Sequence, residues 1–340
     1  MEYGYSLIQH IKIFNSDPIC ALDLNDELLL FGSMLGYFGY FAIKTKKLYV
    51  LSEIEDEHII ATQIKKNKLL FAVGDQKIVT VEKTDNNYNN PVIKENSNYK
   101  DEVEHYKKCD NMFCMIGGDY LFSIELNIPR EEEKKVEERL CTWKIKNLEK
   151  KNSSFSDKIN ISNYWVPFDF DGYNLIYIDF FNDMKRCLNI FSFYHKKFLL
   201  KLNLWEKEDE VIGHISHLKK ISDEKIFLVH GYKICQIRDF KFKLLKEFIH
   251  KGNEIIAIDI SYNNKKELEI VVLDLNCSVY VYNEKDNYEH YFFNLEKLDS
   301  INSSIKEQKF FSMGYPYFIK MYNRYFAITT DQGCFLLKRA

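Results

Sequence analysis

Residues 268–283, LEIVVLDLNCSVYVYN, contain two apolar runs separated by a short turn. Both runs are rich in β-branched and aromatic residues, which favour strands over helices. A turn this short joins neighbouring antiparallel strands. The segment therefore predicts a β-hairpin with a buried pair of strands.

The same unit recurs along the whole chain. Its seven copies occupy residues 28–43, 69–83, 112–126, 174–194, 225–239, 268–283 and 325–339. Successive copies begin 41, 43, 62, 51, 43 and 57 residues apart. These spacings bracket the roughly 40–45 residues of a β-propeller blade. The repeat therefore predicts an array of similar sheets.

Further strands flank each copy. A short apolar run precedes it, as in residues 19–24, 59–64, 165–170, 255–260 and 317–322. A more polar segment usually follows it, as in residues 47–54 and 242–249. Strands buried between neighbouring sheets are continuously apolar, whereas outer edge strands are mixed. Each copy therefore supplies the second and third strands of a predicted four-stranded blade.

The two ends of the chain predict how the array closes. Residues 325–340 end directly after the second strand of the seventh copy, whereas residues 6–14, SLIQHIKIF, form a strand without its own sheet. Pairing them completes the last blade and removes an open sheet edge. We predict an all-β fold, a single seven-bladed β-propeller over residues 1–340. Its approximate blades are 16–55, 56–98, 99–162, 163–209, 210–252, 253–300, and 301–340 with 6–14.

The chain resembles the WD40-repeat family of β-propellers over its full length. Gly213-His214 precedes the first strand of the fifth blade, and Arg238-Asp239 stands 25 residues later, where the family carries Trp-Asp. The resemblance implies that an Asp in the turn after the second strand locks the blade by bonding a histidine. The candidates are Asp75, Asp119, Asp274 and Asp331. Because Trp-Asp is absent and only the fifth blade offers Gly-His, we expect apolar packing to hold the blades.

Composition excludes several classes of protein. The net charge is −3, so the sequence lacks the basic footprint of a nucleic-acid-binding protein. The eight cysteines form no C-x-x-C pair, which favours a reducing compartment, cytoplasmic or nuclear. The uncharged run at residues 28–43 is shorter than the roughly 20 residues of a membrane span. No transmembrane segment or signal peptide is predicted.

Candidate metal and catalytic groups have simpler explanations. His105, Cys109 and Cys114 could contribute to a zinc site, but no fourth ligand lies near them in the sequence. His214 and His217 would point to opposite faces of a strand. We therefore predict no metal and no cofactor.

Two further features have alternative interpretations. Asp169 and Asp171 could form a calcium-binding or acid–base pair, but Asp171-Gly172 also has the composition of a turn, which we favour. No catalytic motif of a hydrolase, nucleotide-binding enzyme or metalloprotease occurs.

The insertion at residues 128–162 is either a docking element or an unselected loop. It includes the helix-like residues 131–140, although residues 139–147 could instead form a displaced strand of the third blade.

The loops that lead into the first strand of each blade carry carboxylates and large aromatic residues. This combination suits a basic peptide with an apolar anchor. The candidate partner-binding residues are Glu57, His58, Glu102, Trp165, His214, Glu254 and Tyr317.

The sequence therefore predicts a non-enzymatic scaffold or adaptor that binds other proteins. We expect a monomeric propeller within a larger cytoplasmic or nuclear complex. A recruiter in trafficking or membrane coats is an alternative function. An enzyme or small-molecule binder that uses the central channel is less favoured.

Overall fold

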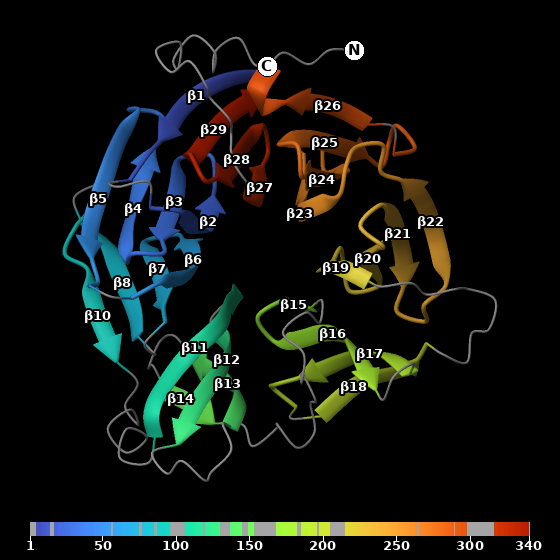
Figure 1. Ribbon diagram of the computed structural model, residues 1–340, viewed down its shortest axis with the longest axis horizontal. Coiled ribbons are helices and arrows are strands. Elements are labelled where there is room, and N and C mark those ends of the chain that lie inside the picture. Colours follow the sequence, from blue (N-terminus) through green and yellow to red (C-terminus); the bar gives the residue numbers. More distant parts are fainter. Residues whose placement is uncertain are drawn as a thin grey trace. The chain divides into compact units, whose positions relative to one another are not determined.

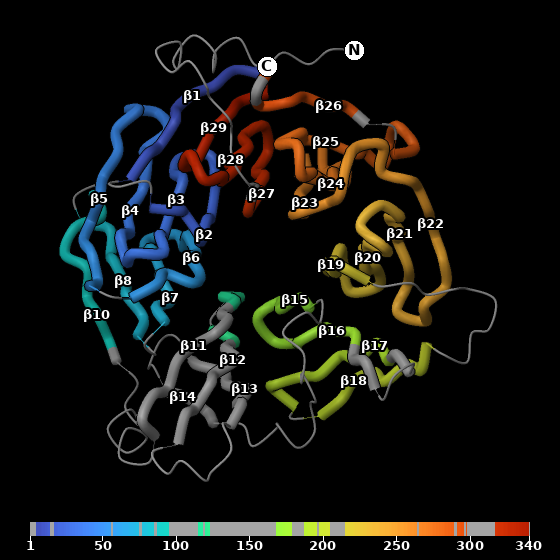
Figure 2. The backbone as a smooth tube through the Cα atoms, viewed as in Figure 1, coloured from blue at the N-terminus to red at the C-terminus, as the bar shows by residue number. Residues whose placement is uncertain are grey.

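The computed structural model describes residues 5–13, 17–55, 57–74, 77–84, 87–95, 106–117, 120–129, 137–144, 149–152, 168–181, 185–195, 197–204, 215–263, 265–288, 290–297 and 316–339. These residues form β-strands and one short 3-10 helix, η4 (Leu295–Lys297). Figure 2 traces the backbone of the chain. The chain separates into two compact units. The first unit comprises Met1–Phe71, Thr80–Pro91 and His250–Ala340, and the second comprises Ala72–Val79 and Val92–Ile249.

The first unit contains three complete antiparallel sheets. One has the order β2-β3-β4-β5, with strands β2 (Ile19–Leu24), β3 (Leu28–Ser33), β4 (Tyr37–Ala42) and β5 (Lys47–Glu53). Another runs β23-β24-β25-β26, with β23 (Ile255–Tyr262), β24 (Leu268–Asp274), β25 (Ser278–Asn283) and β26 (His290–Asn294). The last has the order β1-β29-β28-β27, with β1 (Tyr5–Ile11), β27 (Pro316–Tyr322), β28 (Tyr325–Thr330) and β29 (Gly333–Arg339).

The second unit also contains three complete sheets. Their strands follow the chain order. These are β11 (Tyr106–Gly117), β12 (Tyr120–Pro129), β13 (Glu137–Lys144) and β14 (Glu149–Asn152); β15 (Phe168–Phe170), β16 (Asn174–Phe181), β17 (Lys185–Ser192) and β18 (Lys197–Asn203); and β19 (Ile215–Lys220), β20 (Lys225–His230), β21 (Ile234–Asp239) and β22 (Leu244–Ile249).

The division between the units runs through the remaining sheet, which has the order β10-β8-β7-β6. Its strands are β6 (Ile59–Lys65), β7 (Lys68–Val73), β8 (Lys77–Thr84) and β10 (Val92–Glu95), and β9 (Asn87–Tyr88) pairs with β8. The described residues therefore form seven sheets, as the repeat predicts. A single domain over residues 1–340 stays a prediction.

The two ends of the chain meet in one sheet, as predicted. β1 pairs antiparallel with β29, from Tyr5 opposite Arg339 to Ile11 opposite Cys334. Figure 1 shows blue β1 beside red β29. The N-terminal strand therefore completes the C-terminal blade.

The burial of the strands follows the predicted gradient. β3, β24, β25 and β28 are buried along their whole length, whereas exposed residues recur along outer strands β5, β18 and β22. Each fully buried Leu, Ile, Val or Phe side chain contributes about 1.5–3 kcal/mol. β5, β18 and β22 each carry a register shift against the neighbouring strand. Such bulges twist an edge strand away from unwanted pairing.

The sheet β11–β14 differs from the prediction. Residues 112–126 were expected to supply its second and third strands, but they lie in β11 and β12, the first and second strands. The third strand is β13, which confirms the alternative of a displaced strand for residues 139–144; residues 145–147 lie outside the described part of the chain. The helix-like composition of residues 131–140 is misleading at Glu137–Leu140, because pairing of these residues with β12 overrides their local propensity.

Apolar clusters join neighbouring sheets, as expected, and polar contacts add to this packing. His250 precedes the β23–β26 sheet, and its Nδ1 lies 2.7 Å from the hydroxyl of Tyr282 in β25. Asp274 accepts the N–H groups of Asn276 and Ser278 within its turn. Tyr282 and His250 therefore provide a polar contact without Trp-Asp.

In the β19–β22 sheet, Arg238-Asp239 ends the third strand as predicted, and Arg238 is almost fully buried. Its Nε donates to Gln236 Oε1 at 2.8 Å and its Nη1 to the Phe242 carbonyl at 2.7 Å. A buried cation needs such hydrogen bonds to offset its lost hydration. Arg238 thus connects the third strand of this sheet to the turn that follows it by polar contacts. Gly213 and His214 lie outside the described residues.

Two other features of the sequence can be placed. The uncharged run at residues 28–43 forms strands β3 and β4 with their turn. Within the described part of the chain, no helix is long and apolar enough to cross a membrane. The described cysteines Cys20, Cys187, Cys235, Cys277 and Cys334 are free thiols.

Candidate functional site

Three first strands carry an aspartate at the same position. Asp23, Asp169 and Asp259 are each the fifth residue of an apolar run that begins at Ile19, Trp165 or Ile255. Each carboxylate accepts a backbone N–H from the first strand of the next sheet. The donors are Ile64 at 2.6 Å, Lys220 at 2.8 Å and Met321 at 2.8 Å. The aspartates therefore tie neighbouring sheets together, a role that our sequence reasoning missed.

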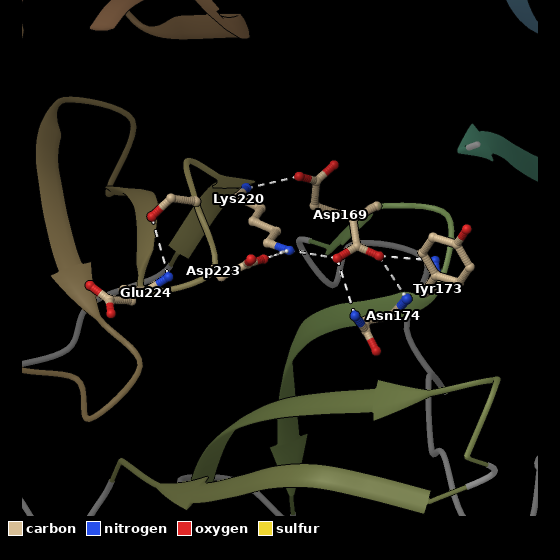
Figure 3. A network of polar contacts seen from close by, with 8 residues as sticks. Asp169, Tyr173, Asn174, Lys220, Asp223 and Glu224 are labelled. Atoms are coloured by element: carbon tan, nitrogen blue, oxygen red, sulfur yellow. Dashed lines mark hydrogen bonds and ion pairs between the residues drawn. The ribbon is translucent and has the colours of Figure 1, made fainter.

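A larger polar network surrounds Asp169 in the second unit (Figure 3). Lys219 Nζ donates to Asp169 Oδ1 at 3.1 Å. Lys220 Nζ donates to Asp171 Oδ2 at 2.6 Å and to Asp223 Oδ1 at 2.7 Å. The network joins β19 and the turn after it to β15 and the turn that follows.

The Asp171 carboxylate is held in its charged form. Burial disfavours this form, but hydrogen bonds from Lys220 and from Tyr173 and Asn174 outweigh burial and lower the pKa of Asp171. Burial likewise opposes the charge of Lys220, but its bonds to Asp171 and Asp223 raise the pKa of that ammonium group.

The predicted turn at Asp171-Gly172 is confirmed. Asp171 Oδ1 accepts the N–H groups of Tyr173 at 2.9 Å and Asn174 at 2.8 Å. Gly172 has a φ of +99°, a conformation that glycine adopts without steric cost. Asp169 thus joins neighbouring strands, and Asp171 orders a turn.

A different arrangement occurs in the first unit, where the β3–β4 turn meets two loops that lead into first strands. The N–H of Met34 donates to the Pro18 carbonyl at 3.0 Å, and the N–H of Leu35 donates to Asp17 Oδ1 at 3.0 Å. His58 Nδ1 bonds the Met34 carbonyl. These bonds fix the backbone of the turn from both sides.

Gly36 allows this close approach. Its φ is +87°, and a Cβ there would lie 2.8 Å from the Glu57 carbonyl oxygen. A side chain would push the turn away from the loop that carries Glu57. The turn therefore presents Met34 and Leu35 from a rigid base.

The β24–β25 turn repeats the arrangement. The N–H of Leu275 donates to the Glu254 carbonyl at 2.9 Å, as Met34 does to Pro18. Asp274 Oδ2 accepts the N–H of Asn253 at 3.0 Å, which fixes the neighbouring loop. In both sheets an ordered turn carries an apolar side chain outward beside an acidic loop.

Four of the seven predicted partner-binding residues lie among the described residues, all in the first unit. The structure brings Glu57 and His58 to the Met34–Leu35 turn and Glu254 to the Leu275 turn. The Tyr317 hydroxyl bonds Asp331 in the β28–β29 turn. The other predicted residues, Glu102, Trp165 and His214, lie outside the described part of the chain.

The candidate zinc ligand His105 and the side chains of Cys109 and Cys114 lie outside it as well. Within the described residues, no group of three or more His, Cys, Asp or Glu side chains could hold a metal ion.

The sequence interpretation missed the apolar part of this surface. Met34 is 45% exposed, Leu35 51% and Leu275 40%. Met34 and Leu35 stand inside a 16-residue uncharged run, which favours their assignment to the core. The only signal was their position beside Gly36, in a turn. We name the loop face as Met34, Leu35, Glu57, His58, Glu254, Leu275 and Tyr317.

Comparison with models of known families and with curated proteins finds no match. Solved structures do match in fold. The computationally designed protein Ika8 aligns with a TM-score of 0.57 and 10% identity, over 99% of this chain and 100% of that chain. The WD40 β-propeller domain of Doa1 aligns with a TM-score of 0.61 and 10% identity, over 98% and 96%. The chain thus has the fold of a seven-bladed, WD40-like β-propeller, which by itself does not select a function.

Proposed function

We propose that this chain is a non-enzymatic scaffold that binds other proteins through the loop face, as a subunit of a cytoplasmic or nuclear complex. The observation that carries the proposal is the exposure of Met34, Leu35 and Leu275 on turns that hydrogen bonds hold in place. Exposed apolar groups on a rigid base lose little conformational entropy when they bind.

The charges on the loop face favour a basic partner. Glu57 and Glu254 stand beside the exposed apolar turns, and Asp331 lies next to Tyr317. Apolar anchors supply most of an interface's affinity, whereas surrounding charges steer association. A basic peptide segment with an apolar anchor fits both features.

Binding is favoured over catalysis because the clustered carboxylates already have structural partners. Asp169 and Asp259 accept backbone N–H groups of neighbouring strands, and Asp171 orders a turn. A general base needs a carboxylate available to a reacting group. The carboxylates near the loop face are candidates for charge contacts with a partner.

Affinity capture from native cells tests the proposal. The variant Met34→Ser/Leu35→Ser/Leu275→Ser removes the apolar contacts, and the control Leu48→Ser/Tyr262→Ser changes exposed residues elsewhere in the same unit. We expect stoichiometric partners of the wild-type chain to be lost with the first variant and retained with the control. Retention of every partner by the first variant contradicts the proposal.

Two further variants separate anchors from charges. Trp165→Ala is expected to weaken the binding of a purified partner at least about tenfold, because loss of an aromatic anchor has an effect of this size. Glu57→Lys/Glu254→Lys is expected to slow association, with a smaller effect at high salt. Both are measured by surface plasmon resonance, and an unchanged off-rate for Trp165→Ala removes Trp165 from the predicted partner-binding residues.

A further inference from the structure

A second exposed surface lies at the opposite ends of the strands, in the second unit. It belongs to the turns that join first to second strands and third to fourth strands. Tyr173, in the β15–β16 turn, is 53% exposed, and Tyr194, in the β17–β18 turn, is 74% exposed. The Phe193 N–H donates to the Tyr173 carbonyl at 3.0 Å, which holds the two turns together.

Two glycines bring a third tyrosine to this surface. A Cβ on Gly117 would lie 2.7 Å from Gly172 Cα, so the β11 end and the β15–β16 turn can approach this closely because Gly117 lacks a side chain. Tyr120, at the start of β12, meets Tyr173 edge to face with ring centroids 5.8 Å apart. We name Tyr120, Tyr173 and Tyr194 the tyrosine patch.

The patch rests on a buried aromatic base. Phe193 packs against Phe122, Phe170 and Phe191, with ring centroids 5.3–6.0 Å apart. Because the Phe193 backbone bonds Tyr173 and the Phe193 ring packs in this cluster, the backbone of the two turns has a fixed support, and the Tyr194 ring meets His195 edge to face with centroids 4.9 Å apart. Pre-ordered aromatic residues of this kind are typical anchors of protein interfaces.

Acidic groups accompany the patch. Figure 3 shows Tyr173 and Asn174 on one side of the polar network and Asp223 and Glu224 on the other. Asp223 is 95% exposed and bonds Lys220, and Glu224 is also exposed. Tyrosine faces attract cations, and Asp223 and Glu224 offer a separate acidic position on the far side of Lys220.

Arginine suits this combination better than lysine. Its planar guanidinium stacks on aromatic rings and still donates to a carboxylate. The chain itself contains cation–ring contacts of both kinds, since Arg238 lies 4.5 Å from the Phe242 ring centroid and Lys201 Nζ lies 3.9 Å from that of Phe198, so the preference for arginine rests on its ability to stack and donate at once. Among the described residues, no cation lies over Tyr173 or Tyr194.

We propose that the tyrosine patch, with Asp223 and Glu224, is an interaction surface for an extended, arginine-bearing segment of a partner protein. The segment places a guanidinium on Tyr173 or Tyr194 and a second basic group at Asp223. This surface is independent of the loop face, which belongs to the first unit.

The test is selection from a random library of twelve-residue peptides displayed on phage, with wild-type chain as target. The double variant Tyr173→Ala/Tyr194→Ala is the counter-target, and Tyr262→Ala is the control because Tyr262 is an exposed tyrosine of the first unit. We expect selected peptides to be enriched in arginine. They should bind the double variant at least about tenfold more weakly, as expected for lost aromatic anchors, and the control unchanged.

Three further measurements sharpen the result. Replacement of the selected arginine by lysine is expected to reduce affinity, and Asp223→Asn is expected to reduce it less and only at low salt. Circular dichroism melting curves check that the double variant remains folded. The proposal is overturned if no peptide is selected, if the selected peptides are proline-rich without arginine, or if the double variant binds them as well as wild type does. A wild-type dimer that Tyr173→Ala/Tyr194→Ala converts to a monomer would assign the patch to a second copy of the chain instead.

Discussion

Neighbouring sheets are joined by ion pairs in both units, but the two sets of pairs differ in exposure. In the first unit, Arg339 of β29 donates twice to Glu269 of β24, at 3.0 and 3.1 Å. Glu269 is only 3% exposed. In the second unit, Lys220 bridges Asp171 to the solvent-exposed Asp223.

The difference lies in what remains when one partner is lost. Without Arg339, the Glu269 carboxylate would be buried with only the Asn283 amide, 3.3 Å away, as a described donor. Without Lys220, Asp171 would keep the N–H groups of Tyr173 and Asn174, and Asp223 would stay hydrated. Arg339 is therefore needed to compensate the buried charge of Glu269. Lys220 provides a local reinforcement.

The largest expected effect is that of Arg339→Met. Removal of one partner from a buried ion pair costs about 3–5 kcal/mol, and the loss appears as a lower free energy of unfolding in urea titrations followed by circular dichroism. The double variant Glu269→Met/Arg339→Met is expected to recover most of this loss, since it leaves no isolated buried charge. A single variant as stable as the double one refutes this account of the pair.

Lys220→Met is expected to have a smaller effect, about 1–2 kcal/mol, because it removes hydrogen bonds to charged groups that retain other contacts. The loss should shrink at high salt, as it does for partly exposed ion pairs. The matched control is Lys68→Met, which breaks an exposed pair with Glu82 and should change stability least. If Lys220→Met lowers the free energy of unfolding as much as Arg339→Met does, the proposed difference between the two ion pairs is wrong.

The repeated strand pairs could be predicted from the sequence because burial on both faces leaves an unmistakable apolar run, as in Leu268–Asp274. β13 was predicted only as an alternative, since Glu137, Glu138 and Arg139 pair with β12 despite a helix-like composition. Long-range pairing overrides local propensity in such strands. The sheet β11–β14 was therefore assigned the wrong pair of central strands.

The site was less predictable than the fold. Glu57, His58, Glu254 and Tyr317 could be selected as candidates because the repeat places loops at equivalent positions, and their role in binding stays a prediction. Met34 and Leu35 were missed because an exposed apolar turn inside an apolar hairpin has the same composition as a buried one. The aspartates at positions 23, 169 and 259 did leave a signal, the shared fifth position of an apolar run, but only the structure shows that they bond the next sheet.

The smallest effects concern pH, and they contrast Asp23 of the first unit with Asp171 of the second. Burial raises the pKa of Asp23, although nearby Lys320 and the Ile64 N–H partly oppose this shift. The folded state therefore binds the Asp23 proton more tightly than the unfolded state does, and stability falls as pH rises from the ordinary carboxyl pKa through the raised one. Asp23→Asn keeps an oxygen that can accept the Ile64 N–H but never ionises. It should gain stability relative to wild type over that range.

Asp171 has the opposite sign. Burial raises its pKa, but the bonds from Lys220 and the turn N–H groups outweigh burial, so its pKa is lowered in the folded state. Its stabilising contribution is present above the ordinary carboxyl pKa and is lost as pH falls through the lowered one. Asp171→Asn should therefore lose stability relative to wild type near neutral pH and match it more closely in acid. Urea titrations at a series of pH values from acid to neutral measure both differences. If the stability difference from wild type changes with pH in the same direction for both variants, contact with a lysine does not determine whether the carboxylate is charged in the folded state.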